Sequence, residues 1–156
     1  MEFRHTKGLP LTTLGLGCAQ LGGLYEPMAE LDALALVDAA WDLGIRYFDT
    51  APYYGFTLSE RRLGAALRAR PRNAYVVSTK VGRLMWPDAG VRPGECGWAA
   101  PLPFRPHYDY THDGNLRSHE DSLQRLGLDR VDILYVHDIG RVTHGERHAH
   151  YWKQLT

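Results

Sequence analysis

The sequence predicts an α/β fold in which parallel strands alternate with helices. Apolar runs typical of strands and segments with helical spacing follow one another four times along the 156 residues. This order indicates right-handed crossovers between parallel strands. No Gly-rich phosphate-binding turn joins the first strand to its helix, which argues against a doubly wound dinucleotide fold. We therefore expect a (β/α)8 barrel, and the four units are about half of one, because such barrels take roughly 250 residues.

The chain begins with a predicted hairpin, a short strand and a strand–helix unit. The hairpin strands, residues 2–6 and 10–14, flank the turn signal Lys7-Gly8. The run "LGLGC" is the first core strand. Leucine, valine and tryptophan recur at helical spacing over residues 31–43, and Gly44 follows as a stop signal. The second strand is "IRYFDT".

The middle of the chain predicts a capped helix, a third strand and a long loop. Thr57 and Glu60 have the spacing of a capping box, and Pro71 ends the helix that they open. The third strand, "AYVVSTK", is rich in β-branched and aromatic residues. Residues 82–106 are dense in glycine and proline, so we expect this stretch to be irregular.

The last third predicts one helix, the fourth strand and a polar tail. Leucines gather on one side of residues 111–126, which indicates an amphipathic helix. The fourth strand is "RVDILYVHD". The polar tail that follows it ends in a further helical segment with no stop signal.

Ionisable side chains stand where three of these strands end. Asp49 follows the second strand, Lys80 ends the third and His137 ends the fourth, while Tyr53 and Tyr54 lie in the loop just after Asp49. Active sites of barrels lie at the carboxyl ends of the strands. We therefore expect these side chains to converge on one rim.

Such a set of side chains supports proton transfer to or from an oxygen. A phenol has an ordinary pKa near ~10, and a neighbouring ammonium lowers it. An imidazole can donate a hydrogen bond to the same oxygen and orient it. No member of the set donates a hydride, so a nicotinamide cofactor would have to supply one.

Four segments of the sequence carry a resemblance to a known family, in this order: "FDTAPYYG", "SERRLGAAL", "VVSTKVG" and "LYVHD". Together they resemble the aldo-keto reductase family of NAD(P)-dependent oxidoreductases, which have a (β/α)8 barrel. The resemblance implies that the family's catalytic tetrad falls on Asp49, Tyr54, Lys80 and His137. The family tyrosine lies five residues after the aspartate and before a glycine, which selects Tyr54 over Tyr53. The family aspartate commonly contacts the nicotinamide ribose, so Asp49 is also the expected cofactor-binding residue for NAD or NADP.

Within the family, "GNLRSHEDSLQRLGLDRVDILYVHD" resembles the branch of dehydrogenases that oxidise fucose or threo-aldoses at C1, and a pyridoxal-dehydrogenase branch is similar. The resemblance implies a sugar or small carbonyl substrate and no metal. The family's adenosine and phosphate contacts come largely from the second half of the barrel, so we expect residues 1–156 to be the N-terminal half of one domain. The alternative is a non-catalytic fragment that acts only by associating with another chain. Open sheet edges favour self-association.

The composition argues against several classes of partner. Eighteen basic residues balance eighteen acidic ones, which argues against a nucleic acid. No apolar stretch approaches the ~20 residues of a membrane span, and the first residues lack the apolar core of a signal peptide. Cys18 and Cys96 form neither a metal-binding spacing nor a disulfide framework, so we expect a cytoplasmic protein. We interpret Cys18 as a small buried apolar residue rather than a nucleophile.

Two further groups of residues have both a functional and a structural interpretation. Three histidines and a glutamate near the end of the chain have the H-x3-H spacing of metal ligands: His144, Glu146, His148 and His150. We favour a polar loop and a solvated helix start for them. The tryptophans of the long loop, Trp86 and Trp98, either line a substrate pocket or pack the loop onto the barrel.

Overall fold

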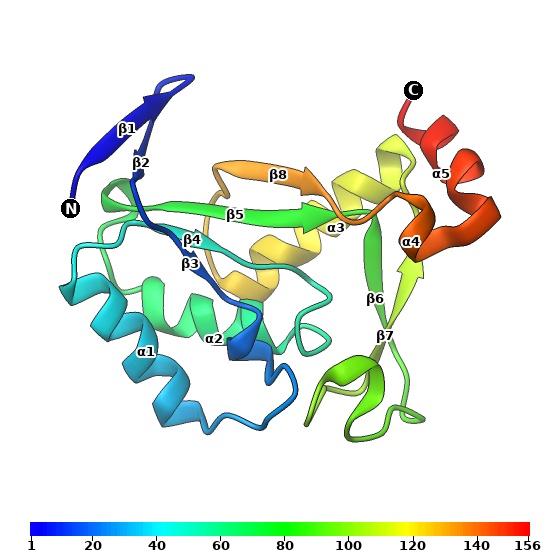
Figure 1. Ribbon diagram of the computed structural model, residues 1–156, viewed down its shortest axis with the longest axis horizontal. Helices are drawn as coiled ribbons and strands as arrows, with labels where there is room; N and C mark the ends of the chain where they lie inside the picture. Colours follow the sequence, from blue (N-terminus) through cyan, green and yellow to red (C-terminus); the bar gives the residue numbers. More distant parts are fainter.

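The computed structural model describes residues 1–156, and a four-stranded parallel sheet lies at its centre (Figure 1). The strands follow one another in chain order: β3 (Leu16–Gly17), β4 (Tyr47–Asp49), β5 (Val76–Val81) and β8 (Ile133–Val136). In the parallel register, Phe48 lies beside Leu16 and Val77, and Lys80 lies beside Tyr135. Neighbouring parallel strands in chain order are the arrangement of a (β/α)8 barrel. The predicted α/β fold of barrel type is therefore confirmed.

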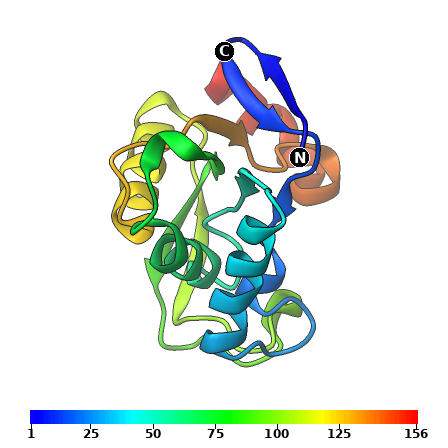
Figure 2. The same cartoon turned by 90° about the vertical axis from the view of Figure 1, so that its left-hand side faces the viewer.

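Three helices cover one face of this sheet: α1 (Glu30–Asp42), α2 (Leu58–Leu67) and α3 (His112–Leu126). They lie side by side in the two views (Figures 1 and 2), with α2 in contact with both neighbours. Burial of apolar side chains between helices and sheet makes the main core, which includes Val37, Phe48, Leu63, Val77 and Leu126. The helices α1 and α3 lie within one residue of their expected positions, whereas α2 ends at Leu67, before the expected stop at Pro71.

The predicted N-terminal hairpin is also present. β1 (Phe3–Thr6) and β2 (Leu9–Thr12) pair antiparallel, and the turn residues Lys7 and Gly8 both have positive φ, 47° and 83°. Two left-handed residues make the tight turn whose twist matches a hairpin. At the other end of the chain, α4 (Arg141–His144) and α5 (His148–Leu155) lie beyond β8. None of the helices is both long enough and apolar enough to cross a membrane.

The prediction of a capping box at the start of α2 is wrong. Thr57 adopts a left-handed conformation, φ 84°, and its side chain makes no cap hydrogen bond. The carboxylate of Glu60 is fully buried instead, where it accepts hydrogen bonds from Thr79 Oγ1 (2.7 Å) and Arg125 Nε (2.5 Å). A buried carboxylate requires such partners. Glu60 therefore joins α2 to β5 and α3.

The stretch from Gly82 to Pro106 is not wholly irregular, which corrects a second prediction. β6 (Arg83–Pro87) and β7 (Phe104–Tyr108) pair antiparallel as a separate ribbon. Figure 1 shows this ribbon leaving the carboxyl end of β5 and running across the direction of the sheet. In a two-stranded ribbon each strand is an edge, so Pro87 and Pro106 need not supply a hydrogen bond to a further strand. The proline content alone was therefore a poor guide.

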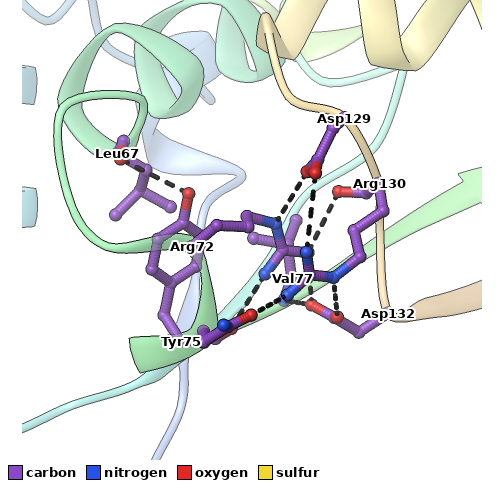
Figure 3. Close-up of polar contacts among 8 residues, drawn as sticks. Leu67, Arg72, Tyr75, Val77, Asp129, Arg130 and Asp132 are labelled. Carbon is purple, nitrogen blue, oxygen red and sulfur yellow. Dashed lines mark hydrogen bonds and ion pairs between the residues drawn. The ribbon is translucent and has the colours of Figure 1, made fainter.

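A network of polar side chains ties the loops together at the amino end of the strands (Figure 3). Arg72 Nη2 donates to Asp132 Oδ2 (2.7 Å) and to the carbonyl oxygen of Arg130 (3.0 Å). The same carboxylate oxygen accepts the backbone N–H of Val77 at 2.8 Å. The network thus joins the loop before β5 to the loop before β8. This end of a barrel contributes to stability rather than to chemistry.

Candidate active site

Three predicted residues meet at the carboxyl edge of the sheet. Asp49 is the last residue of β4, Lys80 is near the end of β5, and His137 directly follows β8. Lys80 Nζ donates to Asp49 Oδ2 (2.7 Å) and to the backbone oxygen of Thr50 (2.9 Å). The backbone N–H of His137 continues the sheet by donating to Val81 at 3.0 Å. The parallel register therefore brings a carboxylate, an ammonium and an imidazole to one rim.

The loop after β4 carries Tyr53 and Tyr54 to the same rim. This loop passes so close to Gly22 that a Cβ at Gly55 would lie 2.4 Å from the Gly22 carbonyl oxygen. Gly55 also has a φ of 63°, so no other residue fits there without strain. The backbone oxygen of Tyr54 accepts the N–H of Ser59 at 3.1 Å, which ties the loop to α2.

The surroundings distinguish the two tyrosines. The Lys80 ammonium lies 4.8 Å from the centre of the Tyr54 ring, whereas the Arg83 guanidinium carbon lies 4.4 Å from the centre of the Tyr53 ring. The ring of His137 is 5.9 Å from both. Burial, with a hydrogen bond to Cys96, raises the pKa of Tyr53 well above its ordinary value. Ionisation of Tyr53 is thus disfavoured, and Tyr54 is the tyrosine beside the Lys80–Asp49 pair.

His137 is an uncharged imidazole at neutral pH. Its residue is only 5% exposed, and this burial, together with the charges of Arg83 and Lys80, lowers its pKa to about 3. The 3.6 Å separation between His137 Nε2 and Asp138 Oδ2 is therefore not an ion pair. Its Nδ1 is buried and has no hydrogen-bond partner within the protein. A neutral imidazole can orient an oxygen by a hydrogen bond, and this one is unsuited to carrying a charge.

Sequence reasoning missed two side chains that support Asp49. Ser78 Oγ donates to Asp49 Oδ1 at 2.6 Å, and the Tyr47 hydroxyl lies 3.1 Å from Ser78 Oγ. A signal was present, since Ser78 stands two residues before Lys80 and alternate residues of a strand share a face. Arg83 was missed because it lies in the stretch that was expected to be irregular.

The two tryptophans have different places, since Trp86 lies in β6 and Trp98 lies in the loop between β6 and β7. Trp98 is buried, and its ring centre lies 5.8 Å from the ring centres of both Tyr53 and Tyr54. Trp86 is half exposed and stacks on His107 with the ring centres 3.8 Å apart. Trp98 therefore packs the loop between β6 and β7 against the tyrosine loop, whereas Trp86 is outside the site.

The histidines near the end of the chain do not form a metal site, and Cys18 is not a nucleophile. His144 is buried and its Nε2 lies 2.8 Å from the Tyr110 hydroxyl, while His148 Nδ1 contacts the backbone oxygen of Gly145 at 3.0 Å. No three His, Cys, Asp or Glu side chains gather where they could hold a metal ion. Cys18 is buried as expected, and burial, followed by the charge of Asp49, raises its pKa to about 12. A thiol in this state is a poor nucleophile.

The residues of this rim fit one end of a nicotinamide cofactor better than the other. The Asp49 side chain is 27% exposed and can accept a hydrogen bond from a ribose hydroxyl. The nearby cations Lys80 and Arg83 are both paired with carboxylates, so neither is free for a phosphate. None of the three cavities in the structure is lined by the predicted tetrad. The fit is thus to the nicotinamide ribose and not to the phosphates.

Comparisons with known proteins agree with this geometry. Residues 13–156 match the Aldo/keto reductase family. The chain is 52% identical to pyridoxal 4-dehydrogenase of Microbacterium luteolum, with 96% of this chain and 46% of that protein covered. It is 47% identical to D-threo-aldose 1-dehydrogenase of a Pseudomonas species, with 84% and 41% covered.

A solved structure is similar over the same region. An aldo-keto reductase from Bacillus halodurans, in its holo form, superimposes with a TM-score of 0.69 at 28% identity, over 99% of this chain and 46% of that one. The chain therefore spans a little under half the length of each of these proteins. By its motifs, its fold and the match over residues 13–156, the chain belongs to the aldo/keto reductase family.

Proposed function

We propose that residues 1–156 are the N-terminal, catalytic half of a (β/α)8 domain that interconverts a hydroxyl and a carbonyl group with NAD or NADP. The observation that carries the proposal is the Lys80–Asp49 pair beside Tyr54, with the neutral His137 on the same rim. The names of the two relatives support a sugar or a small carbonyl compound as the substrate. We favour an aldose or fucose oxidised at C1.

Each side chain of the proposed site has one role. Tyr54 takes the proton of the substrate hydroxyl in oxidation and returns it to the carbonyl oxygen in reduction. Lys80 stabilises the negative charge that develops on the tyrosine oxygen, and Asp49 keeps the ammonium in place. His137 orients the substrate oxygen by a hydrogen bond. A bound NAD or NADP would supply the hydride acceptor or donor, with Asp49 toward its nicotinamide ribose.

A second candidate is a non-catalytic chain that acts only in association with another chain. The observation in its favour is that β3 and β8 are the outer strands of the sheet, and that apolar side chains of β8 are exposed. Unpaired strand edges favour association. Turnover that depends on Tyr54 distinguishes the two candidates.

The test joins residues 1–156 to the portion of Microbacterium luteolum pyridoxal 4-dehydrogenase that lies beyond the matched region. Fucose, threo-aldoses, pyridoxal and simple aldehydes are assayed with NAD and NADP. We expect turnover in the joined protein. Tyr54→Phe should lower kcat by roughly 10²–10⁴-fold, because proton transfer is lost, while cofactor Kd changes by less than about threefold.

The matched control is Tyr53→Phe, which removes the neighbouring hydroxyl and should cost less than about tenfold in kcat. Equal losses of kcat at the two positions would contradict the assignment of the proton transfer to Tyr54. A folded joined protein that binds NAD(P) but turns over none of these substrates would contradict the proposed function.

A further inference from the structure

A buried cation outside the predicted tetrad lies at the carboxyl edge of the sheet. Arg83 is the first residue of β6, and its side chain is only 4% exposed. Its guanidinium carbon lies 4.4 Å from the ring centre of Tyr53 and 5.6 Å from that of Tyr108. Its Nη2 donates to Asp138 Oδ2 at 2.8 Å. A buried charge is retained only with such partners, two aromatic faces and a carboxylate.

The partner of Arg83 stands in a strained turn beside the candidate site. Asp138, which directly follows His137, has a φ of 43°, in the left-handed region that residues other than glycine rarely adopt. The Tyr110 hydroxyl holds the carbonyl oxygen of His137 at 2.8 Å. The turn is thus fixed by Val81 and Tyr110 on the His137 backbone and by Arg83 on the Asp138 side chain.

The charge of Arg83 also acts on the imidazole. Burial is the main cause of the lowered pKa of His137, the positive charge of Arg83 is the second and that of Lys80 is the third. The Asp138 carboxylate and the phenol rings of Tyr53 and Tyr54 complete the groups that face the ring. Two cations near a buried imidazole disfavour its protonated form.

We propose that Arg83 is a positioning residue that holds the Tyr53 ring and the His137–Asp138 turn, and thereby keeps the imidazole in place beside Tyr54. The inference deepens the proposed function and rests on it for the role of His137. It assigns Arg83 no contact with substrate, because the side chain is buried against the Tyr53 ring and paired with Asp138.

The test measures the residues directly and needs no turnover. The full chain, labelled at histidine, tyrosine and aspartate, is titrated by NMR as wild type, Arg83→Gln and Arg105→Gln. Arg105 is the matched control, because it lies on the same ribbon and pairs with Asp88. In Arg83→Gln the protonation midpoint of His137 should rise by about one pH unit, and the Tyr53 and Asp138 signals should move. In Arg105→Gln all three should stay as in wild type.

The Arg83→Lys variant separates the effect of the charge of Arg83 from that of its contacts with Tyr53 and Asp138. It also replaces Arg83→Gln in the test if that variant does not fold. Lysine keeps the charge but cannot both stack on a ring and reach the carboxylate as a planar fork does. The His137 midpoint should stay within about 0.3 pH unit of wild type while the Tyr53 and Asp138 signals move. Unchanged Tyr53 and Asp138 signals in Arg83→Lys, or in a folded Arg83→Gln, would overturn the inference. Because these spectra do not depend on catalysis, an inactive joined protein would reject the proposed function alone.

Discussion

At the scale of single residues, successive side chains of β5 point alternately to the candidate site and to the core. Ser78 and Lys80 point to one face, where both bond to Asp49. Val77 belongs to the core beneath the helices, and Thr79 bonds to Glu60 of α2 on the same side. One strand can thus serve the site and the core at once, because its side chains alternate between faces.

Burial of the neutral His137 should make the stability of the chain depend on pH. Its pKa is about 3 in the folded protein, against an ordinary 6.5, so below pH 6.5 the unfolded chain binds a proton that the folded chain does not. The stabilisation is complete above pH 6.5 and is lost as the pH falls from 6.5 toward 3. Between pH 7 and pH 5 we expect a loss of about 2 kcal/mol from this residue.

Urea unfolding at a series of pH values checks this expectation. The His137→Gln variant should have a flatter dependence of unfolding free energy on pH than the wild type. His144, whose pKa is also lowered by burial and by nearby arginines, should supply part of the dependence that remains. Curves of equal slope for the wild type and His137→Gln would contradict the prediction.

At the scale of elements, α2 and α3 meet at a glycine. A Cβ at Gly64 would lie 2.1 Å from the backbone oxygen of Leu126. Because that neighbour is backbone and cannot move aside, the helices must separate. We expect Gly64→Ala to lower the free energy of unfolding by about 1–3 kcal/mol, despite the higher helix propensity of alanine.

The control for this prediction is Gly140→Ala, at the start of α4. A Cβ there meets nothing within 4 Å. Its φ of −80° is open to any residue. Its effect in urea unfolding should stay within about 0.5 kcal/mol. If both variants have the same unfolding free energy as the wild type, the result would contradict the close contact between α2 and α3 at Gly64.

The loops at the amino end of the sheet depend on the carboxylate of Asp132 (Figure 3). Its removal in Asp132→Ala leaves the partly buried guanidinium of Arg72 and the N–H of Val77 without this acceptor. We expect a loss of about 2–4 kcal/mol in urea unfolding. Asp129→Ala is the control, since Asp129 is exposed and 3.8 Å from Arg72, and it should cost less than about 0.5 kcal/mol. Similar losses for the two variants would reject this account.

At the scale of the whole molecule, the sheet has two open edges, at β3 and at β8. Leu134, Tyr135 and Val136 of β8 remain between 40% and 46% exposed. Apolar strands with free backbone groups pair readily with further strands. The two cations of the candidate site, Lys80 and Arg83, are already paired with carboxylates and are not free for the phosphates of a cofactor.

We therefore predict that residues 1–156, purified as an isolated chain, self-associate and bind NAD(P) poorly. Light scattering after size-exclusion chromatography should give a mass that rises with concentration. Leu134→Lys should reduce the association, because a charge at a strand edge opposes pairing. Leu31→Lys, at an exposed position of α1, should not. A monomer at about 100 μM with micromolar cofactor affinity would contradict this prediction.

Much of the fold and of the candidate site could be predicted because it depends on local patterns. The alternation of strands and helices follows from periodicity, and the parallel order then places Asp49, Lys80 and His137 on one rim, since all the strands end at the same edge. The choice of Tyr54 over Tyr53 came from the resemblance to the aldo-keto reductase family, whose tyrosine lies five residues after the aspartate, and it stays a prediction. Residue type and distance along the chain carry that information.

The tertiary structure decided what depends on contacts between distant residues. Glu60 has the spacing of a capping residue, but its partner, Arg125, lies 65 positions away. The ribbon of β6 and β7 forms at the two ends of a stretch rich in proline and glycine, and its prolines are tolerated because both of its strands are edges. Neither the neutral state of His137 nor the place of Arg83 between Tyr53 and Asp138 can be read from spacing. Each results from desolvation and from charges that only the folded chain brings together.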